Sequence, residues 1–534
     1  MTPPLPRRLA LALLLGLALV AGAAADPFEV ATYADLCKVG TGTDGWTLDA
    51  DYVQTADIQC PAGANFTPIG NSSVWFTGSY DGLGYKIRDL SMYYPLSSYI
   101  GMFTGIDYGA VIKNVVLDNV SVTAGECSGG LFGEVDCARV ENCTVSGSID
   151  CIYKYDPHNH HRALLGLLGG YAYECEILNC SVNGEIRGSE PLCVRYAGGL
   201  VGWAEICNIS SCTTTGTVLY ASSFVGGLVG SSYGNNISSC SADVEIRGYS
   251  DADADVRMWG VGGLVGEAYD TTISACSASG DINYADDACG GLIGEAIGVT
   301  LTDCHATGDV RTNLGYSYSF SANGGFGGTV KRCIIDTCSA EGTVSGGDGG
   351  TGGFIGDCTQ TTVTKCYATG SVEGFGFVGG LIGNYDPSEG VIEDSYATGS
   401  VVCRGVESYC SAGGLIGAWD QHSLISGEYV KNSYSSGRVE VSNLPPEAAG
   451  GAIGKVFNPG VGAIATYWDT ETSGQAASAG GAVGKTTAEM KTIATFAGWN
   501  IATPAEYTDE VWFIVEGEDY PRLAWQGLPA PEEP

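Results

Sequence analysis

Glycine and apolar residues recur in one fixed order along most of this chain. A Gly-Gly-apolar-x-Gly pentapeptide begins at each of ten glycines: Gly129, Gly198, Gly226, Gly262, Gly290, Gly324, Gly352, Gly379, Gly413 and Gly450. Subtracting successive positions from Gly198 onward gives intervals of 27 to 37 residues. Repeats of this length predict a solenoid, in which each repeat forms one coil.

Each pentapeptide is followed by short segments that alternate apolar with polar residues. Ile209-Ser-Ser-Cys212 and then Gly216-Thr-Val218 are typical, and Gly, Asn or Asp separates such segments. Alternation rich in Val, Ile and Thr between turn residues is typical of strands, and no window favours a long amphipathic helix. One repeat has a single apolar face, and that face is buried only when copies stack in parallel.

The expected fold is therefore all-β, a right-handed parallel β-helix of roughly a dozen coils. We place a β-rich N-terminal segment at residues 26–97, the repeat solenoid at 98–456 and a small C-terminal cap region at 457–534. Several connections before the pentapeptides are long, which is typical of a binding face. These connections hold the aromatic residues Tyr249, Trp259, Tyr316, Tyr318, Phe320 and Tyr409.

The first residues have the pattern of an export signal. Arg7 and Arg8 precede an apolar run from Leu9 to Val20, and small residues follow at Ala23 to Ala25. A basic start, an apolar run too short to span a bilayer and a small-residue cleavage site predict a signal peptide over residues 1–25. We expect an exported protein without a membrane span.

The charge balance argues against a nucleic-acid partner. The chain has 24 Lys and Arg against 60 Asp and Glu, a net charge of -36. Binding to nucleic acid requires basic residues that neutralise phosphates, and no basic patch is present in the sequence.

The 21 cysteines of an exported chain predict a disulfide framework with at least one thiol left over. The expected pairs within a coil are Cys137–Cys143, Cys175–Cys180, Cys207–Cys212, Cys333–Cys338 and Cys358–Cys366, and the expected pairs elsewhere are Cys37–Cys60 and Cys403–Cys410. One alternative is bonding between equivalent cysteines of neighbouring coils, for which Cys240, Cys276, Cys289 and Cys304 are the best candidates. Another is a row of free, buried cysteines.

Seven Asn-x-Ser/Thr sequences are candidate glycosylation sites, of which we expect about half to be used. Their asparagines are Asn65, Asn71, Asn119, Asn142, Asn179, Asn208 and Asn236.

Two short loops contain candidate metal ligands. His158, His160 and His161 are three imidazoles close together, and Asp251, Asp253 and Asp255 resemble the start of a calcium loop. A fourth zinc ligand, the calcium-loop glycine and its distal glutamate are missing, so solvated polar loops are the favoured interpretation. We expect neither a metal nor a cofactor.

The repeats resemble the GLUG motif of secreted bacterial and archaeal surface proteins. The flanks agree with this resemblance: Phe66 to Asn71 and Phe76 to Gly82 are similar to the opening segment of such proteins, and Tyr467 to Gly474, Lys485 to Lys491 and Tyr520 to Trp525 to the closing one. The resemblance implies an adhesin-like surface protein. The family also includes stalks attached to peptidases, but this chain has no His-Glu-x-x-His.

The expected function is therefore adhesion or ligand presentation at the cell surface, toward a glycan or a protein on another surface. The first alternative is a structural envelope or sheath component that self-associates through its edges and intermolecular disulfides. The second is a polysaccharide-active β-helix enzyme. We expect no catalysis, because the repeats show few paired carboxylates, and Lys, Arg and His are scarce.

Overall fold

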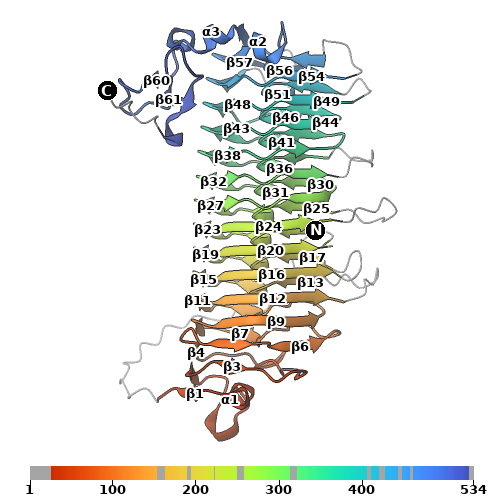
Figure 1. Cartoon of the computed structure of the whole chain (residues 1–534), viewed down its shortest axis with the longest axis vertical. Helices are drawn as coiled ribbons and strands as arrows, with labels where there is room; N and C mark the ends of the chain where they lie inside the picture. Colours follow the sequence, from red (N-terminus) through yellow and green to blue (C-terminus); the bar gives the residue numbers. More distant parts are fainter. Residues whose placement is uncertain are drawn as a thin grey trace.

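The computed structural model describes residues 26–152, 163–188, 194–219, 221, 223–248, 258–312, 321–405, 410–419, 427–442, 448–457 and 461–527. The predicted signal peptide and the loops with His158–His161 and Asp251–Asp255 lie outside these residues. The described chain forms a long parallel β-helix (Figure 1).

Four parallel sheets, named A, B, C and E, run the length of the solenoid. One coil passes from sheet A to sheet B, then to sheet E and sheet C, as in β19, β20, β21 and β22. Sheet C has 12 strands, one from each of twelve coils, so the predicted all-β fold and coil number are confirmed.

The strands belong to the four sheets as follows. Sheet A contains β1 (Phe28–Val30), β2 (Asp51–Gln54), β4 (Ser79–Asp81), β8 (Val111–Lys113), β11 (Arg139–Glu141), β15 (Glu176–Leu178), β19 (Asn208–Ser210), β23 (Asn236–Ser238), β27 (Thr272–Ser274), β32 (Thr300–Thr302), β37 (Ile334–Asp336), β42 (Thr362–Thr364), β47 (Ile392–Glu393), β52 (Gly427–Lys431) and β57 (Val461–Ile464). Sheet C contains β7 (Phe103–Ile106), β10 (Phe132–Asp136), β14 (Gly169–Tyr173), β18 (Val201–Glu205), β22 (Val229–Tyr233), β26 (Val265–Tyr269), β31 (Ile293–Ile297), β36 (Gly327–Lys331), β41 (Ile355–Thr359), β46 (Ile382–Asp386), β51 (Ile416–Trp419) and β56 (Ile453–Val456). Sheet E contains β13 (Ala163–Gly166), β17 (Val194–Gly198), β21 (Ser223–Gly226), β25 (Trp259–Gly262), β30 (Asp287–Gly290), β35 (Asn323–Gly324), β40 (Gly350–Gly352), β45 (Phe377–Gly379), β50 (Ser411–Gly413) and β55 (Ala449–Gly450). Sheet B contains β3 (Ile58–Gln59), β5 (Lys86–Arg88), β6 (Ser91–Tyr94), β9 (Val116–Ala124), β12 (Thr144–Cys151), β16 (Ser181–Gly188), β20 (Thr213–Leu219), β24 (Ser241–Arg247), β28 (Ser277–Ala278), β29 (Ile282–Ala285), β33 (His305–Ala306), β34 (Val310–Thr312), β38 (Ser339–Ala340), β39 (Val344–Ser345), β43 (Tyr367–Ala368), β44 (Val372–Gly374), β48 (Tyr396–Ala397), β49 (Val401–Cys403), β53 (Tyr434–Ser435), β54 (Val439–Val441), β58 (Tyr467–Asp469) and β59 (Val483–Lys485).

Equivalent apolar residues stack in register to form the core. In sheet A, Ile177 pairs with Ile209, which pairs with Ile237, and all three are fully buried. Parallel, in-register stacking gives each apolar side chain the same neighbour above and below, as the repeat predicts.

The pentapeptide forms the turn from sheet E to sheet C, where backbones approach too closely for a side chain. A Cβ on Gly262 would lie 2.0 Å from the carbonyl oxygen of Val265, and a Cβ on Gly263 would lie 2.0 Å from that of Gly291 in the next coil. Contacts this short leave no room for a side chain at these two positions, which explains why the glycine pair recurs in most coils.

Short helices and a separate small sheet lie at the two ends. The N-terminal end contains α1 (Tyr33–Lys38) and η1 (Thr43–Gly45), and the C-terminal end contains α2 (Thr470–Ser473), α3 (Thr487–Met490), η3 (Ile493–Phe496) and η4 (Ala524–Gln526). A three-stranded sheet of β60 (Ile501–Ala502), β61 (Trp512–Phe513) and β62 (Arg522–Leu523) lies beside the upper coils rather than beyond them (Figure 1).

Candidate functional site

On sheet C, the residue directly after a pentapeptide, or after the equivalent segment Gly166–Gly170, points away from the core. In successive coils this row contains Glu134, Tyr171, Trp203, Ser231, Glu267, Glu295, Thr329, Asp357 and Asn384. The second outward row, two residues later, contains Asp136, Tyr173, Glu205, Tyr233, Tyr269, Ile297, Lys331, Thr359 and Asp386. We call these two rows the sheet C face.

Carboxylates on the sheet C face are held by polar neighbours and partly withdrawn from water. Ser231 donates a hydrogen bond of 2.7 Å to Glu267, which is only 6% exposed, and the Tyr171 hydroxyl donates one of 3.2 Å to Glu205. Burial, assisted by Asp136 and Asp107, raises the pKa of Glu134 to about 7. Burial and nearby Asp287 also raise the pKa of Glu295. Such carboxyl groups suit hydrogen bonding to hydroxyl-rich ligands.

An aromatic cluster adjoins this face where sheet E meets sheet C. The rings of Tyr196 and Phe224 stack 5.1 Å apart, Trp203 lies 5.0 Å from Tyr196, and Trp259 lies 4.4 Å from Phe224. Trp259 is 36% exposed, and the Trp203 side chain is partly exposed. Of the aromatic residues predicted in the long connections, only Trp259 lies within the described part of the chain.

Eight equivalent cysteines stack at the corner between sheets A and B. They are Cys143, Cys180, Cys212, Cys240, Cys276, Cys304, Cys338 and Cys366, all free and buried. The Sγ atom of one rung accepts the backbone N–H of the preceding rung, as in Cys240 to Cys276 at 3.4 Å. Ser395 takes the same place in a later coil and accepts the N–H of Cys366 at 3.1 Å. The corner therefore requires a small buried acceptor, which explains the Cys-to-Ser replacement.

The five disulfides predicted within a coil are not formed in the structure. Cys137–Cys143, Cys175–Cys180, Cys207–Cys212, Cys333–Cys338 and Cys358–Cys366 are all free thiols. A three-residue strand of sheet A separates the two members of each pair, as β15 separates Cys175 from Cys180. Because a strand rises about 3.3 Å per residue, the members lie roughly 10 Å or more apart, too far for a disulfide.

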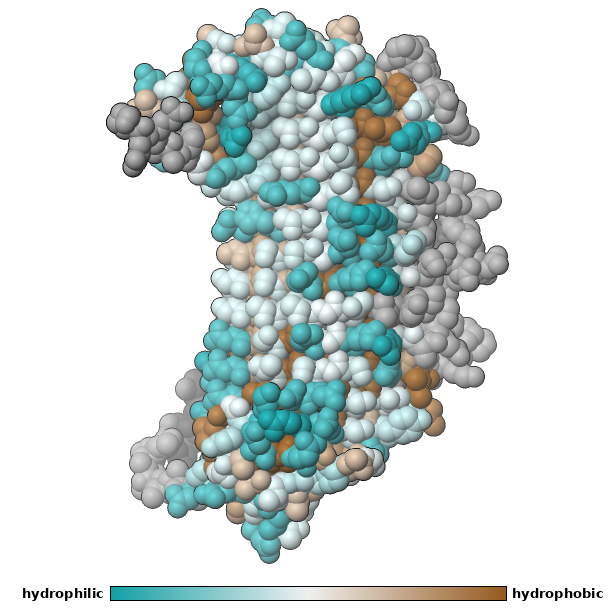
Figure 2. Space-filling view, in the orientation of Figure 1, coloured by the Kyte–Doolittle hydropathy of each residue, from teal (hydrophilic) through white to brown (hydrophobic). Residues whose placement is uncertain are grey.

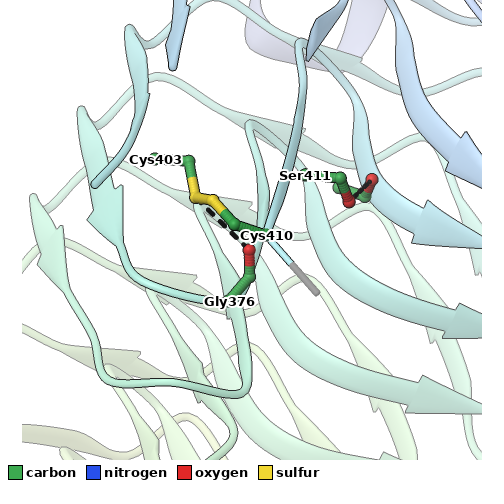
Figure 3. The surroundings of a disulfide bond; sticks show 5 residues. Gly376, Cys403, Cys410 and Ser411 are labelled. Atoms are coloured by element: carbon green, nitrogen blue, oxygen red, sulfur yellow. Dashed lines mark hydrogen bonds between the residues drawn. A yellow bond between two sulfur atoms is a disulfide. The ribbon is translucent and has the colours of Figure 1, made fainter. Parts of the chain in front are cut away.

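The other two predicted disulfides have different outcomes. Cys403 and Cys410 are bonded, with their Cα atoms 6.7 Å apart (Figure 3). Cys37 and Cys60 are free thiols. Burial, assisted by the neighbouring Cys37 thiol, raises the pKa of Cys60 to about 11, so the two thiols are close and their pairing stays a prediction.

Six of the seven asparagines in predicted glycosylation sequences are exposed: Asn65, Asn71, Asn119, Asn142, Asn179 and Asn236. Asn208 is half-buried, and its side-chain oxygen accepts a hydrogen bond of 3.4 Å from Asn236 in the next coil. Several therefore lie where a glycan has room to project.

The described residues contain no group of three or more His, Cys, Asp or Glu side chains arranged to hold a metal ion. Among the same residues, no helix has the length and apolar character that crossing a bilayer requires. The two loops with candidate metal ligands lie outside the described residues, so the expectation that they bind no metal stays a prediction.

Sequence reasoning missed the sheet C face, although a signal for it is present. Its first row consists of the residues that follow the pentapeptides, and its acidic and aromatic character is visible in the sequence at Glu134, Trp203 and Glu267. The repeat alone does not show which alternate positions face outward, and the structure supplies that orientation.

The fold and the pentapeptide define a parallel β-solenoid built from glycine-rich repeats. The GLUG motif matches residues 195–219 and 259–283, each of which spans parts of sheets E, C, A and B. The chain therefore contains GLUG-motif repeats, as the resemblance implies.

Halomucin of Haloquadratum walsbyi (strain DSM 16790 / HBSQ001) is 32% identical over 139 residues, which cover 24% of this chain and 2% of that protein. This chain thus spans a small part of its curated relative. Two solved structures also match. A putative immunoglobulin A1 protease from Bacteroides ovatus has 15% identity and a TM-score of 0.34, covering 57% of this chain and 83% of that one. An IgA1 protease has 16% identity and a TM-score of 0.28, covering 57% and 21%.

Proposed function

We propose that this chain is an exported surface protein that adheres to glycans through its sheet C face. The observation that carries the proposal is the meeting of aromatic rings and carboxylates on that face, at Tyr171, Trp203, Glu205, Tyr233 and Glu267. Aromatic faces stack on sugar rings, and carboxylates accept hydrogen bonds from sugar hydroxyls. The predicted signal peptide supports export.

The repeat architecture suits binding to an extended ligand. Parallel coils are about 4.8 Å apart, so equivalent side chains form rows along which a polymer can make many equivalent contacts. Each contact is weak in isolation, but several contacts on one chain raise the overall affinity.

A glycan array tests the proposal. Tyr233 is 46% exposed, so replacing it removes a ring from the surface without opening the core. We expect Tyr233→Ala to weaken glycan binding by roughly tenfold, the effect of losing about 1.4 kcal/mol of stacking. Tyr93→Ala is the matched control, because Tyr93 is 59% exposed on sheet B. Absence of glycan binding by the wild type, or equal loss in both variants, would contradict the proposal.

Two alternative functions can be tested with the same protein preparation. Glycan cleavage is favoured by Glu267 and Glu295, which stack in register on adjacent coils, and it predicts released reducing ends that Glu295→Gln abolishes. A sheath component is favoured by the exposed free thiol of Cys37, and it predicts polymers that reductant dissolves on gels.

A further inference from the structure

The corner between sheets A and B repeats one tripeptide conformation. Asn142 and Asn179 both have a φ of 53° and face outward, while Cys143 and Cys180 point into the core. The third residue, Thr144 or Ser181, is exposed at the start of a sheet B strand. The corner therefore displays the asparagine and the hydroxyl residue of an Asn-x-Ser/Thr sequence while it buries the residue between them.

Asn142 borders an open groove on the protein surface. The groove has a volume of about 360 Å³ and is lined by Leu83, Gly84, Asn114, Val116 and Asn142. Leu83 is 55% exposed, so the groove has an uncovered apolar wall. Among the described residues, no side chain or backbone group forms a hydrogen bond with the Asn142 side-chain amide.

We propose that Asn142 carries an N-linked glycan whose innermost sugar lies in this groove against Leu83. The inference rests on the proposed export of the chain, because the transfer takes place on the secretory route. The donor is a glycosyl phosphate. The Nδ2 atom of Asn142 bonds to the anomeric carbon, the bond from that carbon to the donor's phosphate oxygen breaks, and Nδ2 loses one proton.

Asn179 lies one coil further along the same corner, and its glycan is excluded when Asn142 is modified. The backbone N–H of Asn142 donates to the carbonyl of Leu178 at 2.9 Å, so the two asparagines occupy neighbouring rungs about 4.8 Å apart. Two branched glycans attached this closely overlap. The groove selects Asn142, because Asn179 is not among the residues that line it.

Site-resolved mass spectrometry of the full chain secreted from a eukaryotic cell line tests the proposal. We expect a glycan mass on the Asn142 peptide that Thr144→Ala removes and Thr144→Ser retains. Occupancy of Asn179 rises in Asn142→Gln. Leu83→Asp speeds enzymatic release of the Asn142 glycan from the folded protein, because the first sugar loses its apolar support.

A secreted protein without a glycan on Asn142 overturns the proposal, whatever the state of the exposed Asn71. Glycans on Asn142 and Asn179 of the same molecule overturn the exclusion. Glycan-array binding by Thr144→Ala distinguishes failure of this inference from failure of the proposed function, because the corner between sheets A and B lies away from sheet C. Binding that persists without the glycan leaves adhesion intact, and a glycan present without array binding defeats adhesion alone.

Discussion

Replacing Cys276 measures what the cysteine row contributes to the solenoid. Cys276 is 1% exposed, and its Sγ accepts the backbone N–H of Cys240 at 3.4 Å. Cys276→Ala leaves that buried N–H without its acceptor, which costs about 1–3 kcal/mol. Loss of the buried sulfur adds about 1 kcal/mol. Cys276→Ser keeps an acceptor, as Ser395 does for Cys366 at 3.1 Å, so we expect it to cost less than about 1 kcal/mol.

Hydrogen exchange under reducing conditions is the appropriate assay, because a long repeat array does not unfold in one step. The peptide that contains the Cys240 amide should lose protection in Cys276→Ala and keep it in Cys276→Ser. Cys289→Ala is the control: Cys289 is fully buried and donates to the Asp287 carbonyl at 3.4 Å, but among the described contacts it accepts no backbone N–H.

Equal destabilisation by Cys276→Ala and Cys289→Ala would refute a role for the sulfur as an N–H acceptor, since only sulfur burial would then matter. Equal damage from Cys276→Ser and Cys276→Ala would also refute that role. Greater damage from Cys276→Ser under oxidising than under reducing conditions would instead indicate disulfides between coils.

The remaining predictions concern Glu134, Trp525 and Gly262. The pKa of Glu134 is raised from 4.5 to about 7, so the folded state retains a proton that the unfolded chain has lost, and stability is full below pH 4.5 and falls by about 3 kcal/mol as pH rises to 7. Thermal unfolding of Glu134→Gln should therefore match the wild type at pH 4 and exceed it at pH 8; equal midpoints at pH 8 would contradict this. Trp525 stacks on Tyr367 at 5.5 Å, so Trp525→Ala should make the C-terminal sheet sensitive to protease while the coils stay resistant, at a local cost of about 2 kcal/mol; unchanged digestion would count against it. Gly262→Ala forces a backbone contact of 2.0 Å and should lower the local free energy of unfolding by about 3 kcal/mol, measured by hydrogen exchange of the surrounding strands. Gly462→Ala, whose nearest atom is 3.9 Å away, should leave that exchange unchanged.

The coil could be predicted from the sequence because its constraint is local. Gly262 and Gly263 occupy positions where a Cβ would lie 2.0 Å from a backbone oxygen, so most copies of the turn retain both glycines. The stacked Ile177, Ile209 and Ile237 follow from the same period. Residue spacing alone therefore predicts the fold class, the number of repeats and the stacked apolar residues of the core.

The disulfide pairs could not be predicted, because sequence spacing does not reveal distance. Cys175 and Cys180 are five positions apart in the chain, and only the extended strand β15 between them shows that their thiols lie at different corners. Cys403 and Cys410 are also close in sequence, but Cys403 is the last residue of strand β49 and the Cα atoms of the two cysteines lie 6.7 Å apart. Whether Cys175 and Cys180 can form a disulfide therefore depends on the conformation of the backbone between them.

The position of the C-terminal sheet could also not be predicted, because the residues that it contacts are far away in the sequence. Tyr367, Tyr396 and Tyr434 stack on one another 5.2 and 5.0 Å apart, and Tyr434 donates to the carbonyl of Pro521 at 2.7 Å. All three tyrosines directly follow the small buried acceptor of the A–B corner. The aromatic residue that recurs directly after this acceptor is the sequence feature from which the position of the C-terminal sheet could have been predicted.

Different groups therefore cover the A–B corner in the upper and in the lower coils of the solenoid. In the upper coils the residue after the buried acceptor is an aromatic ring, and the C-terminal residues pack against it and project beyond the coils beneath (Figure 2). In the lower coils the same place holds Thr144 and Ser181, which complete the Asn-x-Ser/Thr sequences. If glycans cover the lower part, this corner is occupied in both halves of the molecule. A ligand as long as the solenoid then has continuous access only to the other surfaces, and among them the sheet C face combines aromatic rings with carboxylates.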